Sequence, residues 1–554
     1  MDLNWIDLVV FLGFLATVIS VSLYAGRKEQ TSEDYFLAGR KLTWWLIGFS
    51  LIASNISTEH FVGMAGSAFG RVGLAIASYE WMAAITLVFV AWWLLPKFLK
   101  AGIYTMPEFL EYRYSEGARA IMATYIMVAY IIVLLATVLY SGAVALNAIF
   151  DIPAIFMRKF NMTPEDAEFW ANVVGIWGIG IIAGAYTVYG GLKAVVWSDL
   201  LQGGALILGG AIVTILGLQL IGDGNLFVGW QIFASENAGK LHTVLPWNDA
   251  DVPWLAVFIG GLWIPNIFYW GLNQFITQRT LGAKTVAEGQ KGIMLAAVLK
   301  LIIPFIIVIP GIMAFQLFGN EITVGDKAYP YMISKILPPQ LRGIMFAALC
   351  GAVMSTFNSG LNSASTIFTI DLYKKYINKD ASQQRQVLIG RIATGVIVVV
   401  ACLWAPVISG FEGVFKYIQE IWGFISPGIV AAFLVGLIIK KAPPVAAKGA
   451  MLIGLPLYGF CRFTKYVWSI PRMENVLPGI RSVITDFNSW AFLHHMALVF
   501  LVLVAYMLIM TKIKPLEKPV AMPVSKIDTT IHAQTYILGG IIIGLTVMLY
   551  IIFW

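Results

Sequence analysis

Charged residues are scarce in this sequence, and cysteine is almost absent. Asp, Glu, Lys and Arg make up 12% of its 554 residues, whereas soluble proteins average about 25%. A soluble fold of this length is therefore excluded, and the composition indicates a polytopic membrane protein. The three cysteines, Cys350, Cys402 and Cys461, lie in apolar segments. This placement favours packing residues over a disulfide or metal framework.

Several functional motifs are also missing. No G-x-x-x-x-G-K-[ST] run occurs, which argues against a pump with its own nucleotide-binding loop. No zinc or haem spacing is present, so we expect no cofactor. The net charge is +7, but its basic residues are scattered through short loops, so no nucleic-acid partner is expected. No long soluble domain is present, and no obligate protein partner is evident.

Apolar runs of spanning length, about 20 residues each, recur along the whole chain. They predict an all-α membrane protein of about fourteen transmembrane helices. The first run is followed by Arg27 and Lys28, and we interpret it as a retained first helix rather than a cleaved signal. The expected spans are residues 5–25, 44–69, 74–97, 119–149, 171–188, 194–219, 252–278, 292–318, 333–373, 387–405, 409–439, 447–464, 490–511 and 533–554.

Basic residues predict the orientation in the membrane. With Arg119 and Arg279 counted in the inner loops, Lys and Arg favour one set of alternate loops by about two to one. Cytoplasmic loops are the basic ones. The even number of spans then predicts that both termini lie outside, in a multi-pass protein of the plasma membrane, most simply a bacterial inner membrane.

A dense group of polar residues interrupts the second expected span, in SLIASNISTEHFVGMAG, Ser50 to Gly66. So many polar groups cannot face lipid, and a break at membrane depth is typical of the binding site of a secondary transporter. A second break is expected at Gly260–Asn266, where a Gly pair precedes Pro265. Unwound backbone offers carbonyl oxygens to a hard cation. The two breaks lie five spans apart, as two copies of a five-helix repeat would place them; two ordinary kinked helices are the alternative.

A third polar segment covers residues 352–363. Its adjacent hydroxyls, Ser355 and Thr356, are able to complete a sodium shell together with backbone carbonyls of the second span. Small residues in this segment fit close helix packing equally well.

Three ionisable residues lie within expected spans. A buried charge must be paired or serve a pathway. Glu80 and Lys300 can pair with each other and present donors and acceptors to a polyhydroxylated ligand, or form a purely structural ion pair. Asp199 lies near a helix end and is compatible with an interfacial position.

Aromatic residues accompany the second break. Tyr269 and Trp270 follow Asn266 by three and four residues, on the same helical face. A sugar stacks its C–H face on an aromatic ring, while its hydroxyls need amides and charges. Interhelical hydrogen bonding is the alternative role for such polar residues. The candidate sugar contacts are Asn55, His60, Glu80, Asn266, Lys300 and Gln419.

Seven runs of sequence together resemble one family. They are Glu33–Arg40, Ser50–Gly66, Ala75–Trp81, Tyr269–Gln274, Gln278–Leu281, Asn362–Thr369 and Tyr417–Glu420. In their order and number they resemble the sodium/solute symporter family over nearly the whole chain. Within it, the chain looks most like the bacterial sodium/galactose symporter and the animal sodium/glucose cotransporters.

The resemblance implies a single transporter domain, residues 1–554, with a leucine-transporter-like fold. Residues 44–219 and 252–439 would form two inverted five-helix repeats. An extra helix at 5–25 would precede them, and further helices at 447–554 would follow.

The resemblance also implies roles for individual residues. Sodium would bind the carbonyls of Ala53, Ile56 and Ala352 and the hydroxyls of Ser355 and Thr356. The sugar would contact the six candidate residues given above. Tyr269 would cap the sugar on its inner side, and Asp199 would lie on the sodium exit route or at a second sodium. The outer hydrophobic gate would be formed by Met64, Tyr79 and Phe415.

The implied function is sodium-coupled import of a neutral sugar, with no covalent chemistry and with Na⁺ as the co-transported ion. His60 stands where the galactose symporter has Gln, and Thr356 replaces a Ser but keeps the hydroxyl. The hexose class is therefore expected, while the exact sugar and the number of sodium ions stay open. The alternatives are symport of myo-inositol, an N-acetyl sugar or a sialic acid, and, from another class, a channel or a membrane sensor domain.

Overall fold

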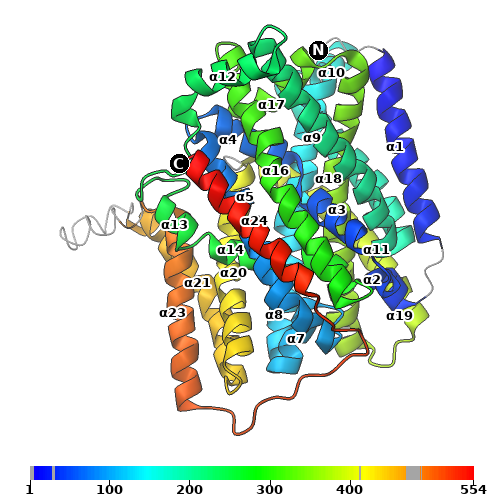
Figure 1. Ribbon diagram of the computed structural model, residues 1–554. Coiled ribbons are helices and arrows are strands. Elements are labelled where there is room, and N and C mark those ends of the chain that lie inside the picture. Colours follow the sequence, from blue (N-terminus) through cyan, green and yellow to red (C-terminus); the bar gives the residue numbers. More distant parts are fainter. Residues whose placement is uncertain (1–4, 28–30, 411–413, 469–486, 488) are drawn as a thin grey trace.

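The protein is a bundle of helices (Figure 1). The computed structural model describes residues 5–27, 31–410, 414–468, 487 and 489–554. The longer helices of the first half are α1 (Trp5–Gly26), α3 (Trp44–Asn55), α5 (Ser78–Phe89), α8 (Glu116–Val128), α9 (Ala136–Phe150), α11 (Pro164–Ile221) and α12 (Leu226–Glu236). Those of the second half are α16 (Val286–Phe318), α18 (Pro339–Ile367), α19 (Gln383–Trp404), α20 (Val414–Ile438), α21 (Pro444–Trp468), α23 (Phe492–Ile513) and α24 (Ala533–Ile552).

Twelve helical stretches of the described part are long and apolar enough to cross a membrane, against the fourteen spans expected. The expected span 44–69 is missing from the twelve because it is divided into short pieces. The expected spans 171–188 and 194–219 both lie in α11, which consists of two helices separated by a kink with non-helical backbone at Gly191 (φ 52°, ψ −153°). Such a positive φ suits glycine, which has no Cβ to clash.

The first predicted break is confirmed. Helix α3 ends at Asn55, and Ile56 adopts an extended backbone (φ −74°, ψ 110°). Ser and Asn side chains compete with helical hydrogen bonds and so favour helix ends. The chain turns helical again in η2 (Glu59–Met64) and α4 (Ala65–Phe69). The last carbonyls of α3 therefore have no partner within their own helix.

The second break is also confirmed, and the glycine pair makes it. Helix α13 (Trp254–Phe258) ends just before Gly260 and Gly261, and α14 (Trp263–Ile267) begins after them. The amide of Leu262 donates to the carbonyl of Ala256, which gives one of the last carbonyls of α13 a partner. A Cβ at Gly261 would lie 1.7 Å from the carbonyl oxygen of Leu493 in α23, so only glycine fits. Pro265 lies inside α14 and does not mark the break.

The expected span 333–373 is divided differently. A short helix, α17 (Ala328–Ile336), stops before Pro338 and Pro339, and α18 begins at Pro339 and continues in η9 (Phe368–Ile377). Proline disfavours helical backbone in the residue before it, so the pair separates the two helices.

The broken helix α3 lies at the centre of the bundle. It packs against α16, α11 and α18, while α16 also packs against α5. Helices α21 and α23 pack against α20 at the opposite side of Figure 1 from α1. Helix α1 begins at the top of Figure 1, and α24 ends in its upper half. The first break thus lies beside α16 and α18, and α14, which follows the second break, lies beside α5. Helices α5, α16 and α18 all carry candidate site residues.

Candidate functional site

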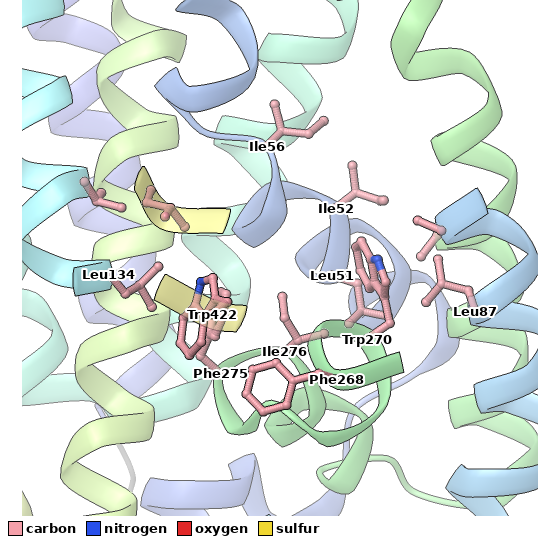
Figure 2. Packing of buried hydrophobic residues seen from close by; sticks show 14 of the residues in the cluster. Leu51, Ile52, Ile56, Leu87, Leu134, Phe268, Trp270, Phe275, Ile276 and Trp422 are labelled. Carbon is pink, nitrogen blue, oxygen red and sulfur yellow. The ribbon is translucent and has the colours of Figure 1, made fainter. Parts of the chain in front are cut away.

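A pocket lies between the two breaks and carries all six candidate sugar contacts. It is walled by residues of α3, η2, α5, α14, α16 and α20. Apolar and aromatic side chains complete the wall, and Figure 2 shows Trp422 on one side of the view and Trp270 on the other, below Ile56. The polar lining residues are Asn55, Ser57, Glu59, His60, Glu80, Asn266, Tyr269, Lys300, Thr356 and Gln419.

Glu80 and Lys300 form the predicted ion pair. The Lys300 ammonium donates to a Glu80 carboxylate oxygen and to Asn55 Oδ1, and its side chain is 1% exposed. His60 Nε2 lies 3.4 Å from the other Glu80 oxygen. The amide of Ser57 points at His60 Nδ1 at 3.5 Å, which leaves Nε2 as the donor to Glu80. Both oxygens of Glu80 thus have a partner at the pocket wall.

Tyr269 closes one side of the pocket. Its hydroxyl accepts a hydrogen bond from Asn55 Nδ2 at 3.0 Å. Asn55 therefore connects the Lys300 ammonium on one side with Tyr269 on the other. Lys300 Nζ also lies 4.9 Å from the centre of the Trp270 ring, within the range of a cation–π contact.

Asn266 contributes a donor that has no partner. Its Nδ2 is buried and makes no hydrogen bond to any described residue, although the side chain borders the pocket. A buried donor left unpaired is costly, so this group suits a ligand oxygen. Gln419 borders the same pocket from α20.

The expected outer gate is placed only in part. Met64 and Tyr79 both line the pocket, and Met64 is 1% exposed. The side chain of Phe415 lies outside the described residues.

The expected sodium ligands meet at the end of α3. Ser355 Oγ lies 3.1 Å from the Ala53 carbonyl oxygen, and Thr356 Oγ1 donates to the Ser54 carbonyl at 3.0 Å. These carbonyls are among those that α3 leaves unpaired at its end. Ile56 follows in extended backbone, and Ala352 lies one turn before Ser355 in α18, fully buried.

Asp199 lies in the same cluster and is fully buried inside the protein. Its carboxylate accepts hydrogen bonds from Ser355 at 2.5 Å, Ser50 at 2.5 Å and Ser54 at 3.0 Å. These contacts join α11, which carries Asp199, to both α3 and α18.

The cluster holds more acceptors than protons. Ser355 has one hydroxyl proton, yet its Oγ lies within hydrogen-bond distance of both Ala53 O and Asp199. One of these acceptors therefore stays unpaired. A hard cation bound by carbonyl, hydroxyl and carboxylate oxygens would satisfy it. In the described part, no group of three or more His, Cys, Asp or Glu could hold a metal ion.

The comparison with family models decides the family. The model of the sodium:solute symporter family matches residues 35–158 and 165–455. The chain belongs to the sodium:solute symporter family. Members of this family are membrane transporters, and the twelve candidate spans agree with a multi-pass membrane protein.

Curated members of the family extend the comparison. The sodium/glucose cotransporter of Vibrio parahaemolyticus is 42% identical over 501 residues, covering 86% of this chain and 88% of that protein. The sodium/myo-inositol cotransporter 2 of Oryctolagus cuniculus is 31% identical over 494 residues, covering 82% of this chain and 69% of that protein.

Among solved structures, a Na⁺-coupled sialic acid symporter in its substrate-bound outward-open state superimposes with a TM-score of 0.73. The match covers 94% of this chain and 100% of that chain at 20% identity, so it shows the fold alone. The fold of this family member is thus leucine-transporter-like.

Two charged residues of this symporter-family chain were given no site role from the sequence. Arg279 was counted as an inner-loop residue, which is wrong, because it is 1% exposed and donates to the Ser50 carbonyl and to Ser359 Oγ. The sequence did contain a signal for a buried role, because Arg279 follows the second break, on the short helix α15 (Gln274–Leu281). Glu59 lines the pocket, and its place in the polar run of the first break could have identified it.

Proposed function

We propose that this protein is a sodium-coupled symporter that imports a neutral sugar of the glucose or galactose class by alternating access. One observation carries the proposal: a polar pocket and a hydroxyl–carboxylate cluster adjoin the same broken end of α3. The 42% identity to a sodium/glucose cotransporter over most of both chains supports the same substrate class.

In this proposal the pocket binds the sugar. Glu80 accepts from sugar hydroxyls, Lys300 and the unpaired Nδ2 of Asn266 donate to them, and His60, which donates to Glu80, adds a further contact. Asn55 and Gln419 complete the polar contacts. Aromatic rings face the C–H surface of the sugar, as sugar-binding pockets require. Tyr269, held by Asn55, caps the sugar toward the inside.

Toward the outside, the proposed gate is hydrophobic. It comprises Met64, Tyr79 and Phe415, of which the first two line the pocket.

Sodium is proposed to bind the oxygen-rich cluster behind the pocket. The ligands are the carbonyls of Ala53, Ile56 and Ala352 and the hydroxyls of Ser355 and Thr356. Asp199 adds a negative charge beside them, either on the exit route of the ion or at a second sodium. Residues 53–56 would then form a wall of both sites, so ordering by sodium would preorganise the sugar contacts and couple the two affinities.

We further propose that residues 44–219 and 252–439 form two inverted five-helix repeats, preceded by the extra helix 5–25 and followed by the helices of 447–554. The two breaks in corresponding positions support this pairing. The basic inner loops support an orientation with both termini outside, and the Vibrio relative supports a bacterial inner membrane.

A second substrate class has a specific observation in its favour. The relatives include sodium/myo-inositol cotransporters at 31% identity, and a cyclic polyol presents the same ring of hydroxyls as a hexose.

The test is uptake by purified protein in proteoliposomes with an inward sodium gradient, against a panel of hexoses, inositols and N-acetyl sugars. A hexose should accumulate only with sodium, and a negative internal potential should increase uptake, because each charge moved gains about 2.3 kcal/mol per 100 mV. Preference for an inositol would support the second class. Sodium-independent, non-saturable flux or no flux would identify a channel or a sensor and reject symport.

A further inference from the structure

A second carboxylate lines the proposed sugar pocket. Glu59 is the first residue of η2, the helix that restarts after the break in α3, and it borders the pocket together with Glu80 and Lys300. Its backbone amide donates to Ser57 Oγ at 3.2 Å, which holds the start of η2 in place. The side chain is only partly buried, so it is accessible from the pocket.

The described residues that line the pocket carry more acidic than basic groups. Lys300 is paired with Glu80, and His60 also contacts Glu80. No Lys, Arg or His nitrogen of the described residues lies within 4.0 Å of the Glu59 carboxylate. The described pocket wall thus carries two carboxylates and one lysine, and no arginine. In a site walled by apolar groups, an uncompensated charge acts strongly on a ligand.

We infer that Glu59 sets the charge selectivity of the pocket: it rejects sugars that carry a carboxylate and accepts hydrogen bonds from the hydroxyls of neutral sugars or the ammonium of amino sugars. This rests on the proposed function, because it concerns the same pocket. An ionised carboxylate is acceptor-only, so it matches a hydroxyl or an ammonium group and repels another carboxylate.

The structural neighbour gives the inference a contrast. The neighbour is a Na⁺-coupled sialic acid symporter, and sialic acid is a sugar that carries a carboxylate. The described pocket of this chain offers no arginine for such a group and places Glu59 where it would repel it. Two proteins with one fold would therefore select opposite ligand charges.

The experiment uses the full-length protein in proteoliposomes and Glu59→Gln, which keeps the shape of the side chain and removes its charge. Sodium-driven uptake of the preferred neutral sugar is inhibited with glucose, 2-amino-2-deoxyglucose or glucuronate, at a pH where the amine of the amino sugar is protonated and Glu59 is ionised. In the unmodified protein the inhibition constant of glucuronate should exceed that of the amino sugar by about tenfold or more, because repulsion between like charges in a site costs at least that much affinity. In the variant this ratio should fall by about tenfold.

Glu165→Gln is the matched control. Glu165 is an exposed carboxylate in the first turn of α11, so the variant removes one charge far from the pocket wall and should leave the ratio unchanged. Glu59→Ser supplies a second neutral side chain if Glu59→Gln does not fold, and Glu59→Asp should keep the ratio of the unmodified protein.

An unchanged ratio in the neutral variants would overturn the role of Glu59 while leaving sodium-coupled sugar transport intact. Absence of sodium-driven uptake of every sugar in the unmodified protein would overturn both proposals. The two failures are therefore distinguishable.

Discussion

The two polar clusters that adjoin α3 differ in what surrounds them. The Glu80–Lys300 pair lies at the wall of a pocket, whereas the Asp199 cluster is closed around its own hydroxyls. The first cluster has an unpaired hydrogen-bond donor on Asn266, and the second has one more hydrogen-bond acceptor than it has protons to pair. A neutral polyol suits the first deficiency and a small cation the second. The proposed division of labour between the two clusters rests on these unsatisfied hydrogen-bonding groups.

The largest effect should come from removing both hydroxyls of the second cluster. Ser355→Ala combined with Thr356→Ala deletes the two side chains that lie against the carbonyls of Ala53 and Ser54. Sodium-stimulated uptake should be abolished, measured as the initial rate against sodium concentration in proteoliposomes.

Thr394→Ala is the control for that pair. The Thr394 hydroxyl is equally buried but donates to Gly390 in its own helix, α19, so its loss should leave the sodium response unchanged. A normal sodium response in the double variant would place the ion elsewhere.

The next effect concerns the pocket. Lys300→Met leaves the buried Glu80 carboxylate without its cation, and breaking a buried pair in this way costs roughly 3–5 kcal/mol of stability. Adding Glu80→Gln should restore most of the thermal stability without restoring sugar binding. Thermal unfolding in detergent would measure the stability of each variant, and sugar competition would measure its sugar binding.

Equal instability in the single and double variants would show that Lys300 acts through packing rather than through charge. Sugar affinity that survives in both would remove the pair from the binding site.

Asp199→Asn should produce a smaller and more selective change. It removes the negative charge from the second cluster but keeps a side chain of the same shape. We expect about a tenfold loss of sodium affinity, with sugar affinity at saturating sodium nearly unchanged. Sodium titration of sugar binding measures both, and a change in sugar affinity alone would contradict the separation of the clusters.

The smallest effect is expected from a surface ion pair. Arg71 contacts Asp251 at 2.5 Å, with side chains 59% and 41% exposed, and also contacts Asp249 at 2.6 Å, whose side chain is 5% exposed. Exposed pairs contribute about 0–1 kcal/mol and are screened by salt. Arg71→Gln should therefore change thermal stability and uptake little, and the small difference should shrink in high salt. A loss as large as that of Lys300→Met would mean that this contact controls a conformational step.

Local patterns predicted much of the fold. Apolar runs located the spans because hydrocarbon imposes a length of about 20 residues. Polar residues around Asn55 and the pair Gly260–Gly261 located both breaks because each weakens a helix. The kink at Gly191 in α11 falls between the expected spans 171–188 and 194–219, so the apolar runs located these two helices as well.

The site was harder to predict than the fold. Residue type and the family resemblance together suggested the six sugar contacts, and the structure brings all six to one pocket. Their assignment to sugar stays a prediction. Arg279 was wrongly assigned to an inner loop, because a single arginine beside a helix break is typical of a loop. Only the folded chain shows its contacts with Ser50 and Ser359. The charge balance around Glu59 likewise depends on which side chains meet in space.

The contact between Gly261 and Leu493 has a consequence for chimeric proteins. Here backbone meets backbone, because a Cβ at 261 would lie 1.7 Å from the Leu493 carbonyl oxygen, so no change of rotamer can relieve a misfit. Helix α23 and the turn before α14 must therefore be exchanged together when segments are swapped between homologues. A graft that brings a larger residue to position 261 without its own matching helix would force the two segments apart.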